Sequence, residues 1–101
     1  MLYALESRLT ILREPQSPAV DPQALALGAL GWVLADDQRA ERLLSLTGMT
    51  PEILRAGLGD PAVLSAVVDF LCAHEPDLVA AAQALGVEPA ALVAARERLT
   101  A

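Results

Sequence analysis

Hydrophobic residues at helical spacing fill residues 60–75, written DPAVLSAVVDFLCAHE. They follow a 3.6-residue period and leave only a narrow polar strip, at Ser65 and Asp69. A helix that is apolar on most sides is normally covered by neighbours on several sides. The pattern therefore predicts a central helix at about 61–74, with the other elements packed around it.

Proline and glycine divide the chain after residue 20 into short segments. Five prolines follow an Asp, Thr or Glu that suits a helix start, and glycines 48, 59 and 86 stand where helices end. The predicted class is all-α, a compact bundle of six or seven short helices around the central one. The predicted ranges are 22–35, 37–47, 51–57, 61–74, 76–85 and 89–99.

The N-terminal segment has a leucine stripe, in which Leu2, Leu5, Leu9 and Leu12 follow one another at intervals of three, four and three. That spacing predicts an amphipathic helix, and a short strand at 8–12 is the alternative. A helix this short is not stable alone in water, so we expect the stripe to dock on its own core or on another chain. The predicted organisation is an arm (1–12), a proline-rich extended linker (13–21) and a helical bundle domain (22–101).

The predicted helix at 22–35 has no charged face. Small residues occupy one side of it, and Ala29 and Val33 lie on another. Either its own chain wraps the helix, or one face meets another subunit. The candidate partner-facing residues are therefore Leu5, Leu9, Leu12, Ala29 and Val33, and both sets could instead be core.

Composition narrows the classes of function that the chain could have. The 101 residues suit one domain, and the net charge of −6, with no lysine, argues against binding nucleic acid or an anionic membrane. The longest uncharged apolar run, 24–35, is shorter than the roughly 20 residues that span a bilayer. Cys72 is the only cysteine, and Glu6 interrupts any signal-peptide core. We expect a soluble, cytoplasmic protein that does not insert into membranes.

Residues suited to catalysis are scarce. Cys72 and His74 are two positions apart, so on a helix they point in different directions and cannot share a metal or form a nucleophile–base pair. We expect Cys72 to be a small core residue and Asp69 to face solvent or accept hydrogen bonds, although a buried Asp69 with a raised pKa is the functional alternative. The sequence predicts no catalytic, cofactor-binding or metal-binding residue and no small-molecule substrate, and it argues against an enzyme.

A helix-turn-helix outline covers residues 78–99, with Ala82, Leu92 and Ala95 directed inward. Its second helix would present residues 88–90, 93 and 94 to a DNA groove, and none of these side chains can donate a hydrogen bond to a base or phosphate. Nucleic-acid binding through 78–99 is therefore the alternative function rather than the leading one.

The segment from about 24 to 99 also resembles a known family. The resemblance rests on Gly31-Trp32 with Asp36, on Thr47-Gly48 followed by Pro51 and Leu54-Arg55, and on Asp60-Pro61 leading to Val68-Asp69-Phe70-Leu71. These features are similar to domain-of-unknown-function family 3572, a group of small, all-helical, mostly alphaproteobacterial proteins. The resemblance implies a helical bundle in a bacterial cytoplasm and brings no activity, cofactor or catalytic residue.

The leading functional hypothesis is a non-enzymatic module for protein–protein interaction or self-association. It would act through an apolar helical surface on a protein partner or on a second copy of the chain.

Overall fold

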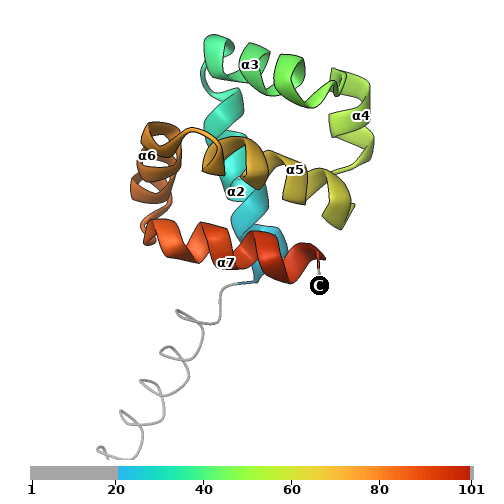
Figure 1. The fold of residues 1–101 in the computed structure, drawn as a ribbon. Helices are drawn as coiled ribbons and strands as arrows, with labels where there is room; N and C mark the ends of the chain where they lie inside the picture. Colours follow the sequence, from blue (N-terminus) through green and yellow to red (C-terminus); the bar gives the residue numbers. More distant parts are fainter. Residues whose placement is uncertain (1–20, 101) are drawn as a thin grey trace, which may run out of the picture.

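The computed structural model describes residues 21–100, which contain six helices and no strand (Figure 1). The helices are α2 (Pro22–Leu34), α3 (Asp37–Thr47), α4 (Pro51–Ala56), α5 (Pro61–Cys72), α6 (Glu75–Leu85) and α7 (Pro89–Thr100). The prediction of a compact all-α bundle is confirmed, and every predicted boundary lies within two residues of the observed one. The arm at 1–12 and the linker up to residue 20 lie outside the described residues.

Local capping explains the helix starts. The side chains of Asp21, Asp36, Thr50 and Asp60 each accept a hydrogen bond from a backbone N–H in the first turn of the helix that follows. Such caps satisfy N–H groups that have no partner within the helix. In α6 the N-cap is His74, which makes no side-chain capping bond. The prediction that Glu75 caps this helix was wrong by one residue, and the imidazole of His74 is left to bind elsewhere.

Two helix ends depend on glycine. Gly48 closes α3 with φ 74° and Gly86 closes α6 with φ 73°, both in the left-handed region. A side chain at either position would be strained, so these residues fix where the chain turns.

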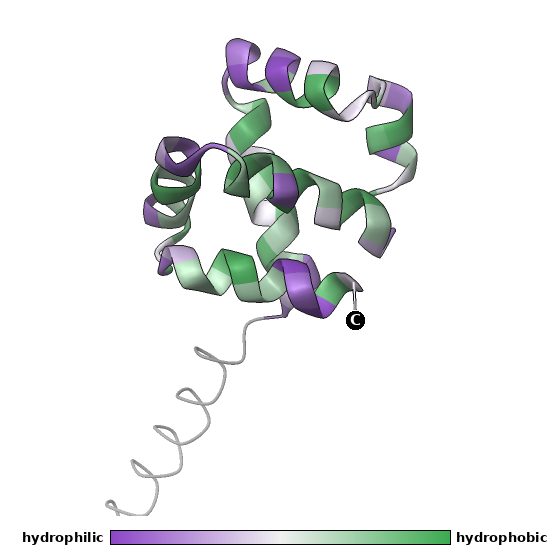
Figure 2. Cartoon of the chain, in the orientation of Figure 1, coloured by the Kyte–Doolittle hydropathy of each residue, from purple (hydrophilic) through white to green (hydrophobic). Residues whose placement is uncertain are grey.

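Two helices share the centre of the fold. The predicted central helix, α5, packs against α2, α3, α6 and α7, and α2 packs against α3, α5, α6 and α7. The central position of 61–74 is confirmed, and α2 crosses it inside the same core (Figure 1). Both helices are predominantly hydrophobic, whereas the first turns of α3 are strongly hydrophilic (Figure 2).

The structure corrects the proposed surface on α2. Ala29 and Val33 are both 0 % exposed and belong to the core. Because α2 is apolar almost all round, α5, α6 and α7 cover the face that a partner was expected to use. Of the two alternatives for this helix, wrapping by its own chain is the observed one.

The small-residue face of α2 allows close packing at one point. A Cβ atom on Gly28 would lie 2.9 Å from a methyl group of Leu85, at the end of α6. Gly31 has open space beside it, so only the Gly28 part of that face is used within the described residues.

The predicted polar strip on α5 is only half correct. Ser65 is 5 % exposed and lies in the core, while Asp69 is at the surface. In the described part of the chain, no single helix is long and apolar enough to cross a membrane. The helices α6 and α7 pass that test only as a pair, and they are bent by 98° at the turn between them.

Candidate functional site: a groove between α3 and α5

A shallow groove of about 340 Å³ lies between the end of α3 and the outer side of α5. Leu46 and Thr47 line it from α3, and Ala66, Asp69, Phe70 and the C-cap residue Ala73 line it from α5 and its end. We call this set the α3–α5 groove. Its lining is mainly apolar.

Leu46 is the unusual residue of the α3–α5 groove. Its exposure of 73 % is the highest among the exposed large hydrophobic side chains of the described chain. Isolated apolar side chains on a surface are ordinary, but Leu46 stands beside other apolar groups in a hollow. This combination is what a docking partner would cover.

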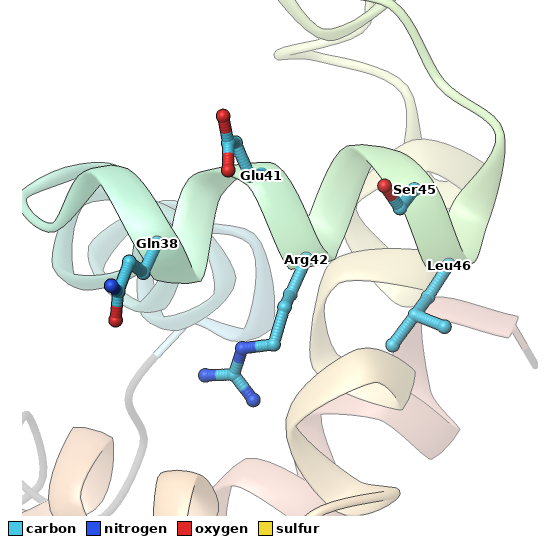
Figure 3. Close-up of a pocket in the computed structure, with 5 residues that line it drawn as sticks. All are labelled: Gln38, Glu41, Arg42, Ser45 and Leu46. Atoms are coloured by element: carbon cyan, nitrogen blue, oxygen red, sulfur yellow. The ribbon is translucent and has the colours of Figure 1, made fainter.

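A second hollow, of about 470 Å³, follows α3 and shares Leu46 with the groove. Figure 3 shows Gln38, Arg42 and Leu46 projecting toward the neighbouring helices, while Glu41 projects to the opposite side of α3. The groove therefore continues toward the N-terminal end of α3 into a more polar region.

Charged side chains attach α3 to α6 at this polar end. The Arg42 Nη2 atom lies 2.9 Å from Asp77 Oδ2, and His74 Nδ1 lies 3.1 Å from the same oxygen. The Asp77 side chain is 14 % exposed, so its carboxylate is partly buried; it accepts a hydrogen bond from Arg42 and lies close to the His74 ring. The Arg42 guanidinium also lies 5.8 Å from the centre of the Phe70 ring. This cluster orients one wall of the groove against the other.

At the α5 wall, Asp69 forms an ion pair with α7. Its Oδ1 atom lies 3.1 Å from Arg96 Nη1, and the Asp69 side chain is 60 % exposed. The expectation that Asp69 faces solvent is confirmed. Ion pairs this exposed add little to stability, so the pair mainly marks the edge of the groove with one acid and one base.

Another arginine fixes the start of α3. The Arg39 guanidinium stacks 3.7 Å from the centre of the Trp32 ring, and its Nη2 donates a hydrogen bond to the Trp32 carbonyl at 2.5 Å. The contact joins the end of α2 to the first turn of α3. Arginine contacts therefore hold the N-terminal half of α3, through Arg39 against α2 and Arg42 against α6.

Residues considered for chemistry do not assemble into a reactive site. Cys72 is half-buried against the core, and the imidazole of His74 is directed to Asp77. Among residues 21–100, no group of three or more His, Cys, Asp or Glu side chains is placed to hold a metal ion.

Burial gives Cys72 a testable property. It raises the pKa of the thiol above its ordinary value of 9.0, while the Arg96 guanidinium lowers the pKa and the Asp69 carboxylate raises it. Because the folded protein favours the protonated thiol, this group stabilises the fold below pH 9 and loses that contribution as the pH rises through the raised pKa. We expect alkylation of Cys72 at neutral pH to be slower in the folded chain than in urea.

The neighbours of Cys72 provide matched variants for this measurement. Arg96→Ala should move the midpoint of the alkylation profile to higher pH, and Asp69→Asn should move it lower. A folded-state midpoint below that of the urea-unfolded chain would contradict the prediction.

Sequence reasoning missed the α3–α5 groove. Its walls come from segments about 20 positions apart in the chain, and the bond between Arg42 and Asp77 joins residues 35 apart. The one available signal was the run Leu43, Leu44 and Leu46, since three leucines so spaced on a polar helix cannot all face the core. Leu43 is fully buried, Leu44 is half-buried and Leu46 is exposed.

The structure tests Ala29 and Val33 but not the other predicted partner-facing residues. Leu5, Leu9 and Leu12 lie outside the described residues, so their role stays a prediction.

Comparisons with known proteins give one match. A protein-family model matches residues 19–101, which includes all six described helices. No curated protein and no solved structure matches the chain.

Proposed function

The chain belongs to the family described as Protein of unknown function (DUF3572), and we propose for it a non-enzymatic function in which the domain binds a protein partner through the α3–α5 groove. Since the family brings no activity with it, the proposal rests on the surface of the molecule. The partner contributes an apolar helix face, and the interaction takes place in the cytoplasm.

One observation supports the proposal: Leu46 is exposed to solvent and lies in the same groove as Ala66, Phe70 and Ala73. Grooves lined by one large exposed side chain and by alanines suit an amphipathic helix, because alanine lets a second helix backbone approach closely. Asp69 lines the groove and Arg42 lines the adjoining hollow, where each already forms an ion pair, Asp69 with Arg96 and Arg42 with Asp77.

A pull-down from a native extract tests the proposal. The tagged chain is compared with Leu46→Asp, which places a charge in the groove. We expect the variant to recover at least tenfold less of a defined partner identified by mass spectrometry, a change of about 1.4 kcal/mol in binding. The fold should be unaffected, because a side chain that is 73 % exposed contributes little to the core.

Val79→Asp is the matched control. Val79 is also an exposed apolar residue, at 37 %, but it lies on α6 and does not line the groove. Equal recovery with wild type, Leu46→Asp and Val79→Asp would refute a role for the groove.

Nucleic-acid binding is the second candidate. The 98° bend between α6 and α7 falls in the range of helix-turn-helix motifs, and Ala82, Leu92 and Ala95 are buried as that motif requires. The exposed side of the second helix opposes this function, because Arg96 is paired with Asp69. The exposed residues of α7 and of the position before it are Glu88, Ala90, Ala94, Glu97, Arg98 and Thr100. Repeating the pull-down with nuclease separates the two functions, since a protein partner survives the treatment.

A further inference from the structure

We propose that the charge of His74 controls how firmly α3 is held against α6, and so makes binding in the α3–α5 groove depend on pH. This inference rests on the proposed function and adds its regulation. Three side chains that meet at one carboxylate are involved: Arg42 from α3, Asp77 from α6, and His74, the N-cap of α6.

The contact between Arg42 and Asp77 links two helices that do not pack closely on each other. Within residues 21–100, α3 packs against α2 and α5, and α6 packs against α2, α5 and α7. Arg42 projects from α3 toward the neighbouring helices (Figure 3), and its Nη2 atom lies 2.9 Å from Asp77 Oδ2. Because the Asp77 side chain is 14 % exposed, salt and water screen this pair less than a fully exposed one. In the described chain, it is the ion pair that joins α3 to α6.

His74 brings a titratable group to the same oxygen. Its Nδ1 atom lies 3.1 Å from Asp77 Oδ2. It is the only histidine of the chain, and an imidazole gains a positive charge as the pH falls from about 8 to about 5. The side chain is 53 % exposed, so it can take up a proton without any movement of the fold.

The helix to which each group belongs decides the direction of the effect. His74 and Asp77 both stand at the start of α6, so they stay together whether or not α3 is in place. When α3 docks, it adds Arg42, a second cation, at the same oxygen. A charged imidazole opposes this docking, because it repels the guanidinium and offsets the charge of the carboxylate that attracts it. By linkage, protonation of His74 favours the release of α3, and loss of the proton favours its attachment.

The other charged groups around α6 leave this effect to His74. Among the helices packed on α6, α2 has no charged residue, and the acid of α5, Asp69, is paired with Arg96 of α7. On α3, Glu41 projects to the side opposite Arg42 (Figure 3). The remaining charged residues of α6 and α7 are exposed to solvent, namely Glu75, Glu97 and Arg98. His74 is therefore the group in the described chain whose titration changes the charge at this contact between about pH 5 and 8.

The attachment of α3 affects the groove through Leu46. Leu46 follows Arg42 by four positions, on the same side of α3, and both line the hollow that continues the groove. If α3 is held less firmly, Leu46 is less fixed relative to α5, and a site that is less preorganised binds its partner more weakly. We therefore expect stronger binding at about pH 7.5 than at about pH 5.5.

Amide hydrogen exchange of the purified chain tests the control of α3. Protection factors, which correct for the intrinsic effect of pH on exchange, are compared at about pH 7.5 and 5.5. We expect those of α3, relative to those of α5, to fall about threefold to fivefold at the lower pH, the size of effect that one ion pair produces. His74→Gln is always neutral and should keep the higher value at both pH values. His74→Lys is always positive and should keep the lower one.

Asp69→Asn is the matched control. It removes the ion pair between α5 and α7, which has no histidine beside it, so the pH response of α3 should equal that of wild type. Asp77→Asn should give low protection of α3 at both pH values. A wild-type chain without a pH response, or a response that persists in His74→Gln, overturns the inference.

The pull-down described for the proposed function, repeated at the two pH values, tests the effect on binding. We expect recovery of the partner to fall about threefold at the lower pH with wild type and to stay equal with His74→Gln. If recovery depends on Leu46 but not on His74, this inference fails and the proposed function stands. If α3 responds to His74 but no partner depends on Leu46, the proposed function fails, and the control of binding fails with it.

Discussion

Replacing Phe70 with alanine is expected to lower the free energy of unfolding by about 3–5 kcal/mol. Phe70 is the only phenylalanine in the chain, is 6 % exposed, and lies on α5, which packs against four other helices. The substitution removes a large apolar group from the core and leaves a cavity that backbone relaxation fills only partly. Urea denaturation followed by circular dichroism at 222 nm measures the loss.

Leu46→Ala is the control for Phe70→Ala. It removes an apolar side chain from the same groove, but one that is 73 % exposed, so stability should change by less than about 0.5 kcal/mol. A loss below about 1 kcal/mol for Phe70→Ala would show that α5 is not the centre of the core.

Val33→Asp is expected to abolish folding, with a destabilisation of at least about 4 kcal/mol. Val33 is fully buried on α2, among apolar side chains of α2 and its neighbours, so an aspartate there would be an unpaired charge without water. Small domains have only about 5–15 kcal/mol of stability in total. The expected observation is loss of the helical dichroism signal and of the cooperative thermal transition.

The same charge at Leu46 provides the comparison for Val33→Asp. Leu46→Asp should retain a cooperative transition, because that side chain is mostly in water. If the Val33→Asp protein folded normally and had lost only its ability to bind a partner, Val33 would have to lie at the surface. That result would contradict the fold described above.

Helix positions were predictable because their signals are local. Asp21 and Asp60 each cap the helix that follows them through a hydrogen bond to an N–H two or three residues ahead, and Gly48 turns the chain by its own φ angle. None of these features depends on distant parts of the chain. The prediction placed all six helices, and it erred at α6, where His74 replaces the expected acidic cap.

Surfaces were less predictable, because burial depends on the other helices. An apolar pattern around all of α2 does not say which face a neighbour covers, so Ala29 and Val33 were candidates both for a partner surface and for the core, and they lie in the core. The α3–α5 groove depends on the position of α3 relative to α5. That position is set by contacts such as the one between Arg42 and Asp77, which join segments far apart in sequence. Sequence periodicity contains no information about such pairs.

The uneven burial of the helices implies that the domain does not open all at once. Leu43 is the only buried residue of α3 and Leu54 the only one of α4, whereas α2 has five and α5 has six. Segments with few buried apolar contacts separate from a fold at a lower free energy than its core does. We therefore expect α3 and α4 to separate from α5 at a lower free energy than the other four helices separate from one another. The α3 wall of the groove is held by fewer buried residues than the α5 wall, so we expect the groove to widen for an incoming helix at a fraction of the free energy of global unfolding.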